Sequence, residues 1–125
     1  MSNQTLACKI ALAGLLLGAA TVPVYAQDAE AVARGNAKFQ HSCEPCHGRG
    51  VGDDGRQMLP GTDALRIKYM GSLPPALEDR TDLTADVIKN YVRQGSWSMP
   101  PFRKTELSDG EIVDIAAYLA ERSSK

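Results

Sequence analysis

Histidine, cysteine and tryptophan are scarce in this chain of 125 residues, which has 2 histidines, 3 cysteines and 1 tryptophan. A structural zinc site takes four protein ligands at suitable spacings. The only histidines are His41 and His47, and His41 stands too close to Cys43 for both to serve one zinc ion. We therefore expect no zinc site in this protein.

An excess of charge of either sign is also missing, because 14 Lys and Arg face 15 Asp and Glu, for a formal net charge of −1. Loss of residues 1–26 would remove Lys9 and no acidic residue, which takes the net charge to −2. Binding to nucleic acids or anionic membranes normally needs a strongly basic surface. The balance of charge therefore gives no indication of either partner, and we expect neither.

Long hydrophobic runs are absent as well, since the longest apolar run covers residues 10–20. A membrane-spanning helix needs about 20 apolar residues. Lys9 before this run, and small side chains at the outer positions of Val24-Tyr25-Ala26 after it, give the layout of a secretory signal peptide. We predict a signal peptide at residues 1–26 and a periplasmic mature chain without a membrane span. An uncleaved membrane anchor is the alternative.

Cleavage would leave residues 27–125 as one small domain with two cysteines, Cys43 and Cys46. An exported protein would usually join such a pair in a disulfide. Here His47 follows the second cysteine directly, and Cys43-Glu44-Pro45-Cys46-His47 is the attachment pattern for a c-type haem. In bacteria this haem is attached outside the cytoplasm, so the predicted export signal and the motif support each other.

Each residue type in the motif has a role in that chemistry. The thiols of Cys43 and Cys46 can each add across one vinyl group of the porphyrin, and the His47 imidazole can then ligate the iron. A thioredoxin-like redox pair would need a β-strand before it, whereas the segment before Cys43 has a helical period. We therefore predict one haem c, bound covalently through Cys43 and Cys46, with His47 as an axial ligand.

The second axial ligand can come from one of the three methionines after residue 26, which are Met58, Met70 and Met99. Met99 directly precedes Pro100-Pro101, and prolines fix φ and cannot continue a helix. The thioether of Met99 is therefore presented from a stiff loop, and we predict that Met99 is the ligand. For Met58 and Met70 we expect places in gaps of the core.

An imidazole and a thioether on the two axial positions suit the transfer of single electrons and leave no position for oxygen or peroxide. We therefore expect an electron carrier rather than an enzyme. The alternative from another class is a haem peroxidase or a gas sensor, which requires an open iron site.

Apolar spacing and caps predict an all-α fold. A helix from Ala29 carries Gly35 and Phe39 on one stripe, and a capping box at Ser108–Glu111 opens the last helix. A glycine inside a helix costs about 1 kcal/mol relative to alanine. We therefore expect Gly35 and Phe39 to receive the last helix near Tyr118 and Leu119.

Two more helices are predicted between these ends of the mature chain. Thr84 as N-cap and Gly95 as stop bound one helix that ends near Gln94. A shorter helix is expected at Thr62–Met70, whereas the glycines within residues 48–55 predict a loop.

Residues 29–121 resemble class I c-type cytochromes. The likeness rests on Gly35 and Phe39, the Cys43–His47 motif, Met99-Pro100 and Ala117-Tyr118-Leu119. It implies a small all-α fold wrapped round one covalent haem, with the first and last helices crossing. It also implies that Cys43 and Cys46 hold the haem, that His47 is the proximal ligand and that Met99 is the distal ligand.

A narrower resemblance is to the cytochrome subunits of 4-cresol methylhydroxylase and related 4-alkylphenol or eugenol hydroxylases. It rests on Leu73–Arg80, Tyr91–Gly95 and Met99–Phe102. It implies an FAD-containing, phenol-oxidising flavoprotein as the electron donor, and a soluble acceptor such as a copper protein or another cytochrome. It also implies that the Pro75 carbonyl accepts the His47 ring N–H. The alternative is a free carrier that serves an oxidase or another dehydrogenase.

Overall fold

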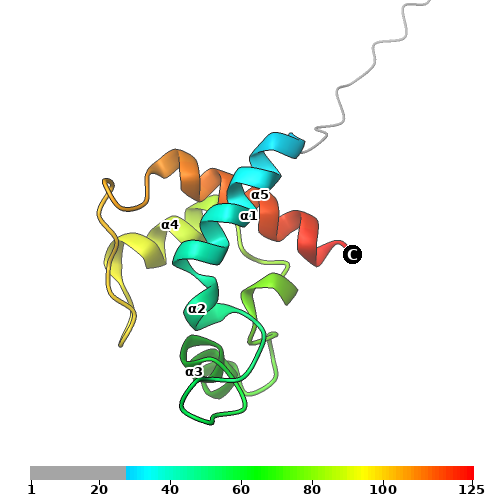
Figure 1. The fold of residues 1–125 in the computed structure, drawn as a ribbon, viewed down its shortest axis with the longest axis vertical. Helices are drawn as coiled ribbons and strands as arrows, with labels where there is room; N and C mark the ends of the chain where they lie inside the picture. The colour runs from blue at the N-terminus through cyan, green and yellow to red at the C-terminus, as the bar shows by residue number, and fades with distance from the viewer. Residues whose placement is uncertain (1–27) are drawn as a thin grey trace, which may run out of the picture.

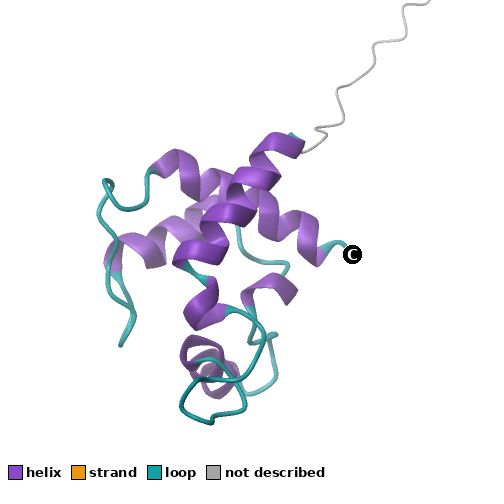
Figure 2. Ribbon diagram, viewed as in Figure 1, coloured by secondary structure: helices purple, strands orange, loops and turns teal. Residues whose placement is uncertain are grey.

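The computed structural model describes residues 28–125, which contain five α-helices and one short 3-10 helix but no β-strand. Figure 2 shows helices and loops alone in this part of the chain. The elements are α1 (Ala29–Ser42), α2 (Glu44–His47), α3 (Pro60–Tyr69), η1 (Leu77–Asp79), α4 (Ala85–Gln94) and α5 (Asp109–Ser123). The predicted all-α fold is confirmed. The predicted signal peptide at 1–26 lies outside the described residues.

The caps of the first and last helices follow from their sequences. Asp28 caps α1 by accepting a hydrogen bond from the Glu30 N–H at 3.0 Å. At the start of α5 the predicted capping box is complete, with Glu111 N–H donating to Ser108 Oγ at 3.2 Å and Ser108 N–H donating to Glu111 Oε2 at 2.7 Å. None of the helices in residues 28–125 combines the length and apolar character needed to cross a membrane.

Helices α1 and α5 cross in the upper part of Figure 1 and form the most extensive helix–helix contact of the described chain. A β-carbon on Gly35 would stand only 1.9 Å from the carbonyl oxygen of Asp114. One turn further along α1, the rings of Phe39 and Tyr118 pack with centroids 5.4 Å apart. The predicted crossing is confirmed, although Gly35 itself meets the α5 backbone at Asp114 rather than Tyr118 or Leu119.

The hydrophobic core joins α1, α4, α5 and the segment before α5. Its buried members are Phe39, Val92, Leu107, Ile112, Ile115, Tyr118 and Leu119. Partly buried apolar side chains pack against this cluster, namely Val32, Cys43, Leu77, Leu83, Ile88, Met99 and Phe102. The second group contains two of the predicted haem-binding residues, Cys43 and Met99. The apolar core therefore extends to the predicted cofactor site.

Helix α4 has the predicted caps, whereas α3 begins before its predicted start. The Thr84 hydroxyl accepts a hydrogen bond from Val87 N–H at 3.3 Å, and α4 stops at Gly95. Helix α3 begins at Pro60 instead of Thr62 because proline is well suited to the first helical turn, where its missing N–H leaves no bond unmade. The glycine-rich residues 48–55 form a loop, as predicted.

Candidate cofactor site

The Cys43–His47 motif is wound into a single helical turn directly after α1. The carbonyl oxygen of Cys43 accepts hydrogen bonds from Cys46 N–H at 3.1 Å and from His47 N–H at 2.8 Å. The Cys43 N–H in turn donates to the Phe39 carbonyl at 2.8 Å, so the motif continues from the last turn of α1. Residues three apart on a helix are surface neighbours. The turn therefore places the two cysteines at neighbouring positions, as attachment of both to one planar ligand requires.

Cys43 and Cys46 both carry free thiols. Cys46 is exposed, whereas Cys43 is partly buried and packs against the core. Burial raises the pKa of the Cys43 thiol to about 11, and the neighbouring Cys46 adds to the shift. The Cys43 sulfur is therefore protonated at neutral pH. A pair of thiols outside any disulfide is the starting material that two thioether bonds to one porphyrin require.

The His47 imidazole is half-buried, and burial lowers its pKa. The neutral imidazole, which this shift favours, is the form that ligates metals. Its Nδ1 is buried and has no hydrogen-bond partner, which is uncommon for a buried ring nitrogen. The bond from His47 to the Pro75 carbonyl is thus not formed in this structure. The role of Pro75 stays a prediction for the haem-bound protein.

The first turn of α3 packs directly on the His47 ring. A β-carbon on Gly61 would stand 2.7 Å from His47 Cε1 and 2.8 Å from His47 Nδ1. Next to it, the buried Thr62 hydroxyl donates to the Gly48 carbonyl at 2.8 Å. Any side chain at position 61 would displace the imidazole. Gly61 therefore supports the His47 ring and Thr62 the backbone after it, which the sequence pattern does not reveal because only the tertiary fold brings α3 to the motif.

Met99 ends a tight turn. Ser96 N–H donates to the Met99 carbonyl at 3.0 Å, and Met99 N–H donates to the Ser96 carbonyl at 2.9 Å. Trp97 within the turn has φ 55° and Gly95 before it has φ 68°. A β-carbon on Gly95 would also stand 2.7 Å from the Met99 carbonyl oxygen, so this position needs glycine for both its dihedral and its close contact.

The three methionines of the described chain lie in different surroundings. Met99 is the one that packs against the core cluster, as Cys43 does. Met70 is 90% exposed, so the expectation that it fills a core gap is wrong. It follows the last turn of α3 in the left-handed region, with φ 49°. Met58 is half-buried in the glycine-rich loop.

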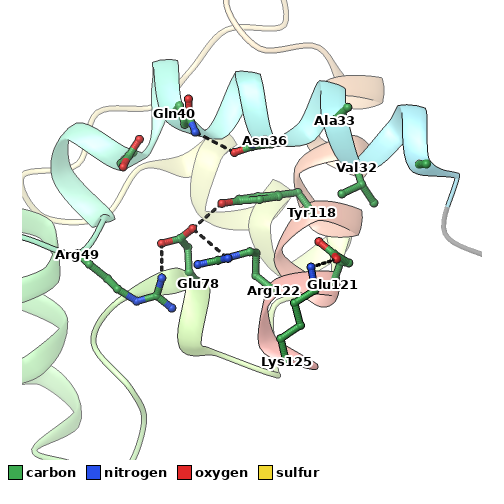
Figure 3. A pocket seen from close by; sticks show the side chains of 12 residues that line it. Val32, Ala33, Asn36, Gln40, Arg49, Glu78, Tyr118, Glu121, Arg122 and Lys125 are labelled. Carbon is green, nitrogen blue, oxygen red and sulfur yellow. Dashed lines mark hydrogen bonds and ion pairs between the residues drawn. The ribbon is translucent and has the colours of Figure 1, made fainter.

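A polar cavity of about 580 Å³ lies between α1, η1 and α5 (Figure 3). Glu78 on its wall accepts hydrogen bonds from the Tyr118 hydroxyl and from Arg49 Nη1, the latter at 3.0 Å. Arg122 Nε lies 3.4 Å from the same carboxylate. Burial, followed by the bond to Glu78, raises the pKa of Tyr118 to about 12, so its hydroxyl remains a donor. This network ties η1 to the chain after His47 and to α5.

The residues of the motif and of the Met99 turn fit a covalently bound haem. Two free thiols and a neutral imidazole stand on one helical turn, and a thioether packs against the same apolar cluster as Cys43. Cys43 and Cys46 would hold the porphyrin, and His47 and Met99 would hold its iron. This fold and this set of side chains define a small all-α c-type cytochrome.

Comparison with known proteins supports this class. The family model described as cytochrome c oxidase, cbb3-type, subunit III matches residues 30–119, and the chain belongs to this family. A similar curated protein is cytochrome c6 from Picosynechococcus sp., which is 28% identical over 101 residues, covering 81% of this chain and 79% of that protein. No solved structure matches the chain.

The chain is therefore a haem electron carrier that holds haem c covalently. The predicted fold class and cofactor are confirmed, and so is the general resemblance to class I c-type cytochromes. It is an electron-transfer protein.

Proposed function

We propose that this cytochrome is the electron-accepting subunit of a periplasmic flavocytochrome whose FAD-containing subunit oxidises a phenol at its para side chain. The support is the likeness of Leu73–Arg80, Tyr91–Gly95 and Met99–Phe102 to the cytochrome subunits of such enzymes. Oxidation of the phenol belongs to the flavoprotein. Bound haem c supplies reversible one-electron reduction of its iron, and a copper protein or another cytochrome takes the electron onward.

The observation that carries the role in electron transfer is the fixed backbone around both proposed iron ligands. The Met99 turn is closed by two backbone hydrogen bonds and by the close contact with Gly95. On the proximal side, the His47 ring packs against Gly61. Side chains presented in this way reorganise little between two oxidation states. An imidazole and a thioether together also keep exogenous ligands off the iron.

The near-neutral charge of the chain bears on how a partner would dock. The net charge of −2 expected for residues 27–125 gives little long-range steering toward a charged partner. Association would then depend on a defined contact patch, as in a complex whose subunits stay together. A subunit role fits this better than rapid shuttling steered by charge.

The test is purification of the native protein from its source at low and high ionic strength. The proposal expects the haem-containing fraction to carry FAD in a constant ratio and to reduce its haem when an alkylphenol is added. A haem protein that runs as a flavin-free monomer at every concentration would overturn it.

A free carrier that serves an oxidase is the second candidate. The family match to an oxidase subunit and the similarity to cytochrome c6 favour it. It predicts that the reduced monomer is oxidised, with saturable kinetics, by membranes that contain a terminal oxidase. Carbon monoxide separates both candidates from a peroxidase or gas sensor, because only an open iron site would bind it at neutral pH.

Location in the periplasm is part of the proposal and rests on residues 1–26. We expect the mature protein to begin at Gln27. N-terminal sequencing of the protein recovered from the periplasmic fraction tests this, and a chain that starts at Met1 in the membrane fraction would contradict it.

A further inference from the structure

Arg93, near the end of α4, reaches across the chain segment that follows the Met99 turn. Its Nη1 donates to the Phe102 carbonyl at 3.0 Å, and its Nη2 donates to the Leu107 carbonyl at 2.7 Å and to Asp109 Oδ1 at 2.6 Å. The side chain is only 19% exposed. One guanidinium thus joins α4, the returning segment and the first turn of α5.

These contacts close the loop that contains Met99. The chain leaves α4 at Gly95, makes the turn that ends at Met99, and returns to α4 at Phe102. There the Phe102 N–H donates to the Val92 carbonyl at 2.7 Å, while the Phe102 carbonyl accepts from Arg93. Both polar backbone groups of Phe102 are therefore bound to neighbouring residues of one helix, and the base of the loop is fixed three residues after Met99.

The charge on Arg93 is balanced in place. Asp109 also pairs with Lys89 at 2.8 Å, and the hydrogen bonds from Lys89 and Arg93 hold the pKa of Asp109 well below its usual range. Lys89 lies on the same helix as Arg93, and its ammonium donates to the Asp109 carboxylate and to no backbone carbonyl of the described chain. Lys104 Nζ also lies 3.7 Å from this carboxylate, so three cations share one partner. Arg93 differs from Lys89 in its bonds to the carbonyls of Phe102 and Leu107.

We propose that Arg93 is a positioning residue for Met99, which holds the loop in the conformation that keeps the thioether on the haem iron. The inference rests on Met99 being the distal ligand. A guanidinium can serve both carbonyls and the carboxylate at once because its donors form a rigid fork, whereas a lysine ammonium is a single point charge on a flexible stem. Loss of the Arg93 hydrogen bonds should therefore weaken the bond between Met99 and the iron more than it lowers the free energy of unfolding.

The test measures competition between Met99 and added imidazole in the oxidised holoprotein, through loss of the far-red absorbance band of methionine-bound iron. Each hydrogen bond that Arg93 loses weakens the loop modestly. We therefore expect Arg93→Gln to lose half of the band at an imidazole concentration about tenfold lower than the wild type needs. Lys89→Gln is the matched control, and it should stay within about twofold of the wild type. A value for Arg93→Gln equal to that of Lys89→Gln overturns the proposal.

Two further variants keep the outcomes separate. Met99→Ala must lack the band without any imidazole, and a band that survives in it would show that the ligand assignment is wrong, independently of Arg93. Should Arg93→Gln fail to attach haem or fold, Arg93→Lys decides the matter. It retains a cation beside Asp109, and the proposal expects it to lose the band at lower imidazole than Lys89→Gln does.

Discussion

Gly35 and Asp114 meet backbone to backbone where α1 crosses α5, without space for a methyl group between them. Ion pairs flank this contact, from Arg34 to Asp114 at 2.8 Å and from Lys38 to Glu111 at 2.8 Å. The crossing joins the first and last helices of the described chain through contacts that need no cofactor.

Replacement of Gly35 tests this contact. Gly35→Ala should lower the free energy of unfolding by about 1–3 kcal/mol or more, because a β-carbon there collides with backbone that cannot turn aside. Gly110→Ala is the control, since a β-carbon at that helical position meets nothing within 4 Å. It should leave stability unchanged or raise it by up to about 1 kcal/mol. Urea unfolding followed by circular dichroism compares them, and equal loss in both variants would contradict the model of a tight crossing.

The assignment of Met99 is tested against the other methionines. Met99→Ala should abolish the far-red methionine–iron band and lower the reduction potential, because a thioether favours ferrous iron. Met70→Ala should leave both unchanged, since Met70 is 90% exposed, and Met58→Ala should leave them nearly so. Absorbance spectra and redox titration of the three holoproteins give the answer. Loss of the band in Met58→Ala would transfer the ligand role to the glycine-rich loop.

Stability should fall in acid in part through Glu111. The hydrogen bonds from Lys38 and then from Ser108 lower the pKa of this carboxyl to about 2 from its usual 4.5. A lowered pKa in the folded state contributes stability that is complete above the usual pKa and lost as the pH falls through the folded value. The wild type should therefore exceed Glu111→Gln in stability at pH 6, and the difference should shrink between about pH 4.5 and 2. Glutamine can still form the capping box, so the variant isolates the charge.

The Glu78 network should respond to loss of one hydroxyl. Tyr118→Phe keeps the ring that packs on Phe39 but removes the hydrogen bond to Glu78, whose side chain is 11% exposed. Hydrogen bonds to charged groups contribute about 1.5–3 kcal/mol, and we expect a loss in that range. Tyr91→Phe, on the exposed side of α4, should cost little. Thermal or urea unfolding measures both variants. If Tyr118→Phe unfolds at the same midpoint as Tyr91→Phe, the hydrogen bond from Tyr118 to Glu78 adds no stability beyond the ion pairs with Arg49 and Arg122.

Features encoded by neighbouring residues could be predicted from the sequence. The Ser108–Glu111 capping box, the Thr84 cap and the stop at Gly95 each depend on side chains within a few positions of one another. The crossing at Gly35 could also be predicted, because a glycine inside an otherwise apolar helical stripe implies that another segment packs closely against it. The Cys43–His47 motif belongs to the same group, since its chemistry is set by spacing alone.

Features that depend on distant residues could not be predicted in this way. Gly61 lies against His47 because α3 folds back on the motif, and both Pro60 and Gly61 stand before the helix start that the sequence predicts at Thr62. Glu78 and Tyr118 are 40 positions apart, and no local pattern relates them. The error at Met70 is local, because this residue ends α3 in the left-handed region, with φ 49°, and its side chain is 90% exposed.

The turn before Met99 carries the chain's single tryptophan, Trp97, whose side chain is fully exposed in this structure. An indole emits light that a nearby porphyrin quenches, so the brightness of Trp97 would report how far that turn stands from the haem. No other tryptophan contributes background. In the haem-bound protein, Trp97 fluorescence would therefore follow the position of this turn, without labels, when the thioether binds or leaves the iron.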